Sequence, residues 1–162
     1  MAQADYFLKL NGIDGESEVK GHEKEIQISS FSFGCANQGS GGYGGGSGSS
    51  KASVQDIHIT KQVDNATPNL YKYCFQGNSI DQAIITVRKA GGDDPLDYLT
   101  MTLTEVFVSS VSTSGHDGGG IAQESLSLNF SKVHMVYKLQ DPTGAGQDGP
   151  DITIDVKQHT VS

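Results

Sequence analysis

A glycine-rich segment is the first place in this chain where residue types could do chemistry. Residues 34–52 hold eight glycines and, near their end, Lys51. A phosphate-binding P-loop needs Gly, four residues, then Gly-Lys-Ser/Thr at the start of a helix, so that backbone amides and the lysine meet the phosphates. Here Ser50 precedes Lys51, Ala52 follows it, and the next residues predict a strand. We therefore expect no nucleotide site in this segment.

Histidine and serine residues raise the alternative of a small hydrolase. His116 and Asp117 are adjacent in a second glycine-rich segment, and Ser47 lies in a Gly-Ser-Gly sequence. A catalytic serine must be held rigidly, typically on a strand-to-helix turn, and a low-complexity loop does not hold it so. We therefore favour a chain that is not an enzyme. We expect solvated surface side chains for all the histidines, which are His22, His58, His116, His134 and His159.

Patterns for metal and redox chemistry are also weak. No two histidines lie two or four residues apart, as paired metal ligands on one element do. Asp93, Asp94 and Asp97 lack the ligand spacing and terminal Glu of a calcium-binding EF-hand. Cys35 and Cys74 match no zinc or redox spacing, so we expect two unpaired, inert thiols. We predict no metal and no cofactor.

The elements that would position any site are mostly strands. Alternating or β-branched runs predict strands within residues 6–10, 26–33, 54–59, 83–89, 98–111, 126–139 and 152–156. The parity of the apolar positions switches at Ser29-Ser30 and again at Ser131-Lys132. A parity switch inside one strand is typical of a β-bulge, and bulges suit a strongly curved sheet or small barrel.

One helix and three loops complete the prediction. Thr67 is a good N-cap, Pro68 suits the first helical position, and Gly77 can end the helix, so we expect a helix over about 67–76. Residues 34–52, 112–120 and 141–150 predict long loops. Strand patterns continue on both sides of every loop, so residues 1–162 are predicted to form a single domain.

Charge narrows the class of partner. Acidic residues number 19 against 11 basic ones, a formal net charge of −8, and this argues against nucleic acid or an anionic membrane as a partner. The chain has no apolar run of the roughly 18 residues that a membrane span needs. Residues 1–6 have neither the basic nor the apolar segment of a signal peptide, so we expect synthesis in the cytoplasm. A structural or binding role is favoured.

Several sequence blocks occur in an order that is specific when they are taken together. They are Gly15-Glu16-Ser17, Phe31-Ser32-Phe33-Gly34, Val54-Gln55-Asp56-Ile57, Thr67-Pro68-Asn69-Leu70, Arg88-Lys89-Ala90-Gly91-Gly92, Val108-Ser109-Ser110-Val111-Ser112 and Leu128-Asn129-Phe130. With them the chain resembles the Hcp family, whose members build the inner tube of the bacterial type VI secretion system. The resemblance covers about residues 6–140. One departure is that the aromatic block, often tryptophan in the family, has Phe31 and Phe33 here.

The resemblance implies a mainly β fold of two packed antiparallel sheets that close into a β-barrel, with one short helix. It implies a homohexameric ring with a wide channel, and rings that stack into a tube inside a contractile sheath. Such a tube bears a spike tip protein, carries small effector proteins as their chaperone, and is secreted through the type VI machine. A phage-type tail tube subunit is the alternative, because it shares this architecture.

Two surfaces are implied for such a ring. Phe31 and Phe33 have one parity and Ser32 has the other, so Ser32 faces out of the barrel if the phenyl rings fill its core. That side would be the lumen, the outer wall or a subunit contact, and the small hydroxyls of Ser30 and Ser32 favour the lumen. The glycine-rich loop is expected to contact the next ring, through Gly39, Ser40, Tyr43, Gly46 and Ser49.

Overall fold

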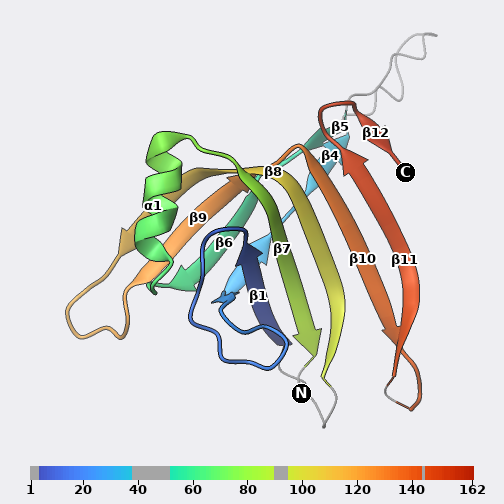
Figure 1. Ribbon diagram of the computed structural model, residues 1–162, viewed down its shortest axis with the longest axis horizontal. Coiled ribbons are helices and arrows are strands. Elements are labelled where there is room, and N and C mark those ends of the chain that lie inside the picture. The colour runs from blue at the N-terminus through green and yellow to red at the C-terminus, as the bar shows by residue number, and fades with distance from the viewer. Residues whose placement is uncertain (1–3, 38–51, 90–94, 144) are drawn as a thin grey trace.

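Alternating strands make up most of the computed structural model, which describes residues 4–37, 52–89, 95–143 and 145–162 (Figure 1). The elements are β1 (Ala4–Leu10), β2 (Ile26–Gln27), β3 (Ser30–Ser32), β4 (Cys35–Asn37), β5 (Ala52–Val54), β6 (Ile57–Gln62), α1 (Thr67–Gln76), β7 (Ile80–Lys89), β8 (Leu96–Ser114), β9 (Gln123–Asn129), β10 (Lys132–Gln140), β11 (Gly146–Asp155) and β12 (Thr160–Val161). The predicted class, mainly β with one short helix, is confirmed.

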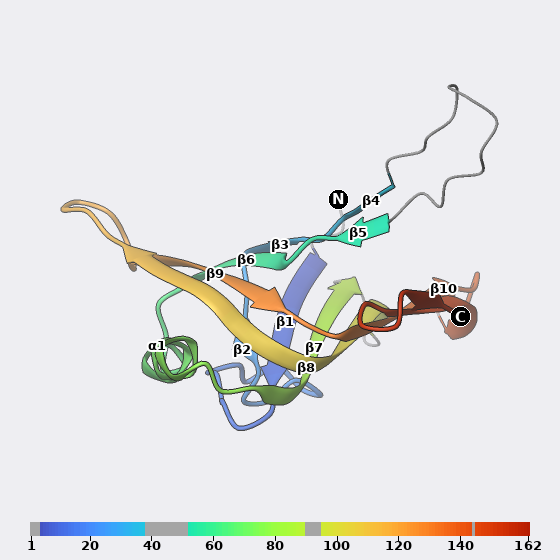
Figure 2. The same ribbon diagram turned by 90° about the horizontal axis from the view of Figure 1, so that it is seen from above.

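Two antiparallel layers share the long strand β8 (Figure 2). The first sheet has the order β12-β11-β10-β8-β7-β1-β2, and the second sheet has the order β8-β9-β6-β3. The first half of β8 pairs with β7 and β10, whereas its second half pairs with β9. Glu105 lies between the halves with φ 52°, a left-handed conformation that bends the strand from one layer into the other. The bend brings the two sheets face to face.

The expected closed barrel is wrong, because among the described residues no sheet closes on itself. The edge strands β2 and β3 follow each other along the chain but pair with different strands, β1 and β6. The chain steps between the layers at two residues: the Ile28 amide donates to the Tyr6 carbonyl (3.1 Å) and the Ser29 amide to the Thr60 carbonyl (2.8 Å). At this edge the two sheets are therefore joined only by the chain that passes from β2 to β3, whereas a closed barrel would have paired strands there.

The two parity switches mark such crossings rather than the predicted bulges. At the second one, Asn129 pairs with Phe107 in the second sheet, while Lys132 pairs with Thr104 in the first. The Ser131 amide between them donates to the Thr104 carbonyl (3.0 Å). Because both sheets face one core from opposite sides, a chain that changes sheets also changes the parity that points inward.

The core lies between the layers and is almost wholly apolar. Its most deeply buried members, at most 2% exposed, include Leu8, Ile85, Met101 and Leu103 from the first sheet, Ile57, Ile59, Leu126 and Leu128 from the second sheet, and Leu70 from α1. Phe31 and Phe33 are half-buried against this core, and Phe33 lies 6.0 Å from Phe130 between ring centroids. The aromatic block therefore packs inward, as its parity predicted.

The helix spans the predicted residues, with one difference at its start. Gly77 ends α1 with φ 67°, and its amide donates to the Tyr73 carbonyl (3.0 Å). Ala66 holds the N-cap position expected for Thr67, which is the first helical residue. No side chain caps the helix, and Asp64 Oδ1 instead accepts from the amide of the N-cap residue Ala66 (3.0 Å). At ten residues, α1 is too short and too polar to cross a bilayer, and it is the one helix among the described residues.

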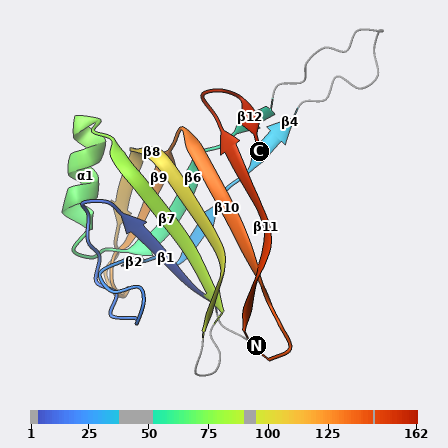
Figure 3. The same ribbon diagram turned by 45° about the vertical axis from the view of Figure 1, so that its right-hand side comes forward.

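The described loops are shorter than predicted, because strand pairing continues into serine- and glycine-rich sequence. Cys35 pairs with Val54, so a short hairpin opens the 34–52 segment. At the other loops, β8 continues to Ser114 opposite β9, and β11 begins at Gly146. Figure 3 shows β10 and β11 at the side of the first sheet that lies away from α1.

Candidate functional site

The outer face of the second sheet is the most uniform polar surface of the described structure. Residues on β6 alternate between buried Ile57 and Ile59 and exposed His58 and Thr60, and the neighbouring strands follow the same alternation. We call the polar outward positions the hydroxyl face: Ser30, Ser32, His58, Thr60, Gln62, Ser110, Ser112, Ser114, Gln123, Ser125, Ser127 and Asn129. None of these residues is Asp, Glu, Lys or Arg, but the Asp56 carboxylate lies beside the face and accepts from Asn129 Nδ2 (3.0 Å). The outward position opposite Asn129 is apolar, because Phe107 occupies it and is 40% exposed.

Ser30 and Ser32 lie together on this face, at the free edge of the sheet. Both are exposed on β3, whereas Phe31 between them packs against the core. A hydrogen bond joins Ser30 Oγ to Thr60 Oγ1 (2.5 Å), and Ser32 pairs with His58 across the strands. The alternation thus placed both serines outside the core correctly. The rest of the hydroxyl face was not predicted, although the serines of residues 108–114 and 123–129 carry the same alternating signal.

Hydroxyl groups at the opposite edge of the face satisfy one another. A register shift between Val108 and Ser110 turns Ser109 onto this surface. Ser109 Oγ donates to Asp56 Oδ2 (2.9 Å), and the hydroxyls of Ser109 and Ser110 both lie 2.6 Å from Ser127 Oγ. Polar groups that are already paired offer few free donors to a passing molecule.

A buried ionic cluster supports the same strands from the inner side. Lys61 on β6 is fully buried, and its Nζ lies 2.5 Å from Glu124 Oε2 on β9 and 2.9 Å from Asp64 Oδ1. The hydroxyls of Thr67 on α1 and Thr113 on β8 donate to Glu124 (3.0 and 3.1 Å). The cluster ties β6, β9, β8 and α1 together. Sequence reasoning missed it, although both charged residues occupy inward positions of alternating strands.

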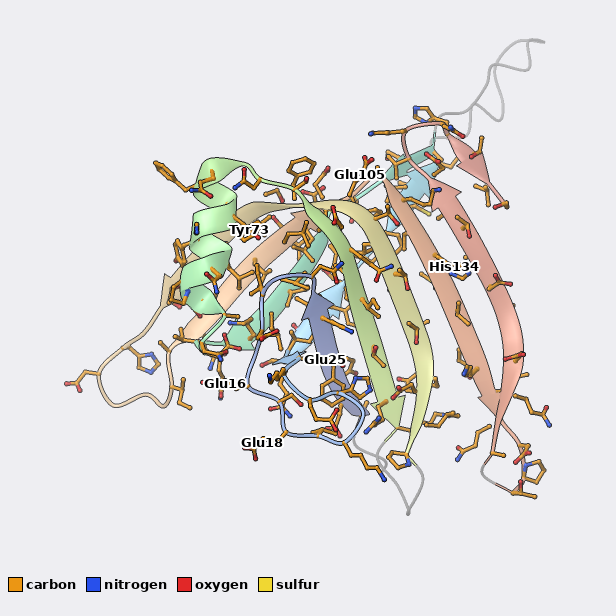
Figure 4. All side chains as sticks on the ribbon, in the orientation of Figure 1. Glu16, Glu18, Glu25, Tyr73, Glu105 and His134 are labelled. Atoms are coloured by element: carbon orange, nitrogen blue, oxygen red, sulfur yellow. The ribbon has the colours of Figure 1, made fainter. Side chains whose placement is uncertain are left out.

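His22 was expected to be exposed, and this is wrong. Its ring is 6% exposed and stacks on Phe7 with centroids 4.3 Å apart. Nδ1 lies 2.8 Å from Oε2 of Glu25, a residue labelled in Figure 4, and Nε2 lies 3.1 Å from Asp97 Oδ2. The other oxygen of Asp97, Oδ1, accepts from Arg88 Nε (2.8 Å). Phe7 has the outward parity of β1 and needs an apolar cover, which the histidine ring supplies. The cluster holds the loop between β1 and β2 against the first sheet.

The other candidate residues do not converge on one site. His116 and Asp117 are exposed in the loop between β8 and β9, and His134 on β10 pairs with Asp151 (3.0 Å) (Figure 4). Cys74 is half-buried and Cys35 is exposed, so only the expectation of free thiols is confirmed. The remaining candidates lie outside the described residues: Ser47, Lys51, Asp93, Asp94 and the loop residues Gly39, Ser40, Tyr43, Gly46 and Ser49.

The described residues form a two-layer β protein whose second sheet presents mainly hydroxyl and amide side chains on its outer face. Its sequence matches the family model described as "Type VI secretion system effector, Hcp" over residues 7–137. It is 44% identical over 146 residues to protein hcp1 of Pseudomonas aeruginosa, with 90% of each chain covered. The chain belongs to the Hcp family of type VI secretion proteins, which are secreted tube proteins.

Solved structures agree with this assignment. The crystal structure of Hcp1 from Salmonella typhimurium is 36% identical, covers all of both chains and superimposes with a TM-score of 0.77. A second structure, described as a type six secretion system protein, is 27% identical, with 99% of this chain and 100% of that chain covered and a TM-score of 0.89. The resemblance inferred from the sequence blocks is therefore confirmed.

Proposed function

We propose that six copies of this protein form a ring whose channel is lined by the hydroxyl face, and that rings stack into the type VI inner tube. The subunit is made in the cytoplasm and leaves through the type VI machine with a spike tip protein. The contractile sheath surrounds the tube, and small effector proteins travel in its channel. The observation that carries the proposal is a sheet face whose named strand positions include no Asp, Glu, Lys or Arg, with the Asp56 carboxylate beside Ser109 and Asn129, on a chain of net charge −8.

The charge distribution supports a channel wall. A channel wall of acidic side chains, repeated in six subunits, would repel any acidic cargo. The hydroxyl face avoids this, and its paired serines hold cargo by many weak contacts rather than a few strong ones. Such a wall lets an effector bind during assembly and leave after delivery. A closed ring also prevents the unlimited growth that an open head-to-tail contact would give.

An arginine on the face tests the assignment of the channel. Ser32→Arg adds bulk and charge six times around the proposed lumen, whereas Thr104→Arg makes the same change at an exposed position of the first sheet. We expect both variants to keep the ring mass in light scattering and only Ser32→Arg to lose effector co-purification. Unchanged effector recovery would place Ser32 outside the channel, and loss of the ring would place it at a subunit contact.

The glycine-rich loop is proposed to contact the next ring, with Tyr43 as its anchor. Shortening residues 39–49 removes Gly39, Ser40, Tyr43, Gly46 and Ser49. The single ring is expected to persist in light scattering, whereas tube growth and secretion are expected to stop. Normal secretion of the shortened protein would contradict this role.

A hydrolytic role is tested at His116, the histidine that a triad would need. The exposed loop position of His116 and Asp117 gives no rigid site for catalysis. We expect His116→Ala to leave ring mass, secretion and killing of target cells unchanged. Loss of killing with an intact, secreted ring would revive the enzyme hypothesis.

A further inference from the structure

The chemistry of the second sheet's outer face changes at one end. There the last row across the strands consists of Phe107 on β8, Asn129 on β9 and Asp56, which directly precedes β6. Phe107 pairs with Asn129, and Nδ2 of Asn129 donates to Asp56 Oδ1 (3.0 Å). We call these three residues the end row. They bring an aromatic ring and a carboxylate onto a face that otherwise presents mainly hydroxyl and amide groups.

Asp56 holds the carboxylate of the end row in a fixed orientation. Both of its oxygens accept hydrogen bonds, Oδ1 from Asn129 and Oδ2 from the Ser109 hydroxyl (2.9 Å). Both donors are neutral, and no Lys, Arg or His of the described residues, His58 on the same face included, forms an ion pair with Asp56. A carboxylate oxygen accepts more than one hydrogen bond. The charge is therefore oriented but not neutralised, and it stays able to bind a cation.

Phe107 supplies the apolar part of the end row. Its side chain is 40% exposed, whereas its neighbours along the strand, Val106 and Val108, point into the core and are at most 4% exposed. Glu105, labelled in Figure 4, marks the bend of β8 two residues earlier. Covering the exposed part of the ring with an apolar group is favourable, and the face of an aromatic ring also attracts a cation. The ring therefore offers a contact that the surrounding hydroxyls lack.

The spacing within the end row sets the size of the group that can bind there. Phe107 and Asp56 flank β9, and because neighbouring strands lie about 4.8 Å apart, the two residues are about 10 Å apart across the sheet. Side chains one turn apart on a helix have Cβ atoms about 5–6 Å apart. The long stem of a lysine or arginine extends this reach and itself packs on apolar surface. One apolar and one basic side chain on the same helix face can therefore contact both ends of the row.

We propose that the end row is the recognition point for cargo, and that it selects effector proteins that present a basic side chain beside an apolar one. The inference rests on the proposed channel and adds the chemistry of the cargo. Charge complementarity supports it, because Asp56 is unpaired among the described residues and lies beside strand positions that include no Asp, Glu, Lys or Arg. In a ring of six copies, the end row occurs six times around the channel. The paired serines then add weak contacts, whereas the end row provides the selectivity.

Labelled peptides measure this selectivity directly. The probe is a helical, fluorescein-labelled peptide with one Arg and one Leu a single turn apart. One control peptide has Glu in place of the Arg, and the other has Ser in place of the Leu. Fluorescence anisotropy reports binding to the intact protein at low and at high salt. We expect the Arg-Leu peptide to bind most tightly, and to bind less tightly at high salt because salt screens the contact with Asp56.

Variants of the end row test where the peptide binds. Asp56→Asn should weaken binding of the Arg-Leu peptide about two- to fivefold at low salt and reduce its salt dependence. Phe107→Ser should weaken binding at both salt concentrations, and Phe107→Leu, which keeps an apolar side chain, should retain most of it. The matched controls Asp81→Asn on β7 and Phe75→Ser on α1 make the same changes at exposed positions elsewhere. They should bind like the unmodified protein.

Circular dichroism and light scattering check that each variant is folded and keeps its mass. Asp56→Asn, which replaces a carboxylate by an amide of the same shape, keeps the test valid if Phe107→Ser does not fold. Equal binding by Asp56→Asn and Asp81→Asn, or equal binding of the three peptides, would overturn the recognition point while leaving the hexamer standing. A monomeric unmodified protein that kept the peptide preference and its loss in Asp56→Asn would overturn the hexamer but support the end row as a binding site.

Discussion

The inner face of the first sheet is apolar on both sides of β8, but the same chain covers only one of them. On the β7 and β1 side, Ala83, Ile85 and Leu8 are fully buried beneath the second sheet and α1. On the side of β10 and β11, which we call the wing, Tyr137 and Ile152 are half-buried and Leu139 is 46% exposed. The alternation is equally clear on both sides. It therefore tells which face is apolar but not whether this chain or another covers it.

Ion pairs differ between the two sides in the same way. The covered side contains the fully buried pair of Lys61 and Glu124. Near the wing, Lys157 Nζ lies 2.7 Å from Glu105 Oε2, and both side chains are more than half exposed. The hydrogen bond from Lys157 lowers the pKa of Glu105, and the same bond raises the pKa of Lys157. The loss of one partner therefore changes the free energy of unfolding more at the buried pair, because water screens the charges of the exposed pair.

The largest expected effect is at the buried pair. Lys61→Met leaves Glu124 buried without its cation, which costs about 3–5 kcal/mol of the free energy of unfolding. Urea denaturation measures this cost, and the double variant Lys61→Met, Glu124→Leu should recover part of it, because the fully buried carboxylate is gone while Asp64, the second partner of Lys61, remains. Lys157→Met is the matched control with a much smaller effect. Equal losses of unfolding free energy in Lys61→Met and Lys157→Met would contradict the expected difference between the buried and the exposed ion pair.

The next largest effect is expected for Leu103 on β8, compared with Leu139 on the neighbouring strand β10. Leu103→Ala removes a fully buried side chain and should cost about 2–5 kcal/mol of unfolding free energy. Leu139→Ala should cost less than about 0.5 kcal/mol within the subunit, because surface substitutions rarely cost more. It should instead weaken the ring on dilution. A large loss of subunit stability at Leu139 would show that the chain itself covers the wing.

A glycine at the end of α1 gives a smaller, local effect on the covered side. Gly77 has φ 67° with no atom within 4 Å of an added Cβ, so Gly77→Ala costs only the backbone strain of about 1 kcal/mol. Gly120 is equally open but does not have this left-handed conformation. Thermal unfolding should therefore show a lower Tm for Gly77→Ala and no loss for Gly120→Ala. Equal Tm values would contradict the capping role.

The smallest effect is a pH dependence near the wing. Because the pKa of Glu105 is lowered from 4.5, its stabilising contribution is complete above that pH and is lost as the pH falls through the folded-state pKa. Because the pKa of Lys157 is raised from 10.5, its contribution is complete below that pH and is lost as the pH rises further. Lys157→Gln should flatten both limbs slightly in denaturation series. Steeper limbs in the variant would contradict the pairing.

Local signals predicted the strands, the helix and the outward position of Ser32. Each of these depends on periodicity or on residues close in sequence, such as Pro68 and Gly77 around α1. The parity of the apolar positions also switches where the chain passes from one sheet to the other. A single sequence does not distinguish such a change of sheet from a β-bulge. That distinction depends on which strand pairs with Ser30 or Lys132, and those partners lie far along the chain.

Long-range partners explain the failed expectations about side chains. His22 was expected to be exposed because nothing nearby shows that Phe7 and Asp97 meet it. Lys61 on β6 and Glu124 on β9 are far apart in the sequence. Neither residue alone therefore predicts that the two side chains are buried as a pair. A charged residue at an inward position of an alternating strand was the available signal. It indicates a buried partner of opposite charge without naming that partner.

The mass of the unmodified protein in solution tests the central claim most directly. Six copies of a 17.1 kDa chain give about 103 kDa, and light scattering should find this mass over a wide range of protein concentrations. A ring of this size would leave the hydroxyl face and the wing as the surfaces to be assigned by the variants above. A mass of 17.1 kDa at every concentration would contradict the ring and, with it, the channel.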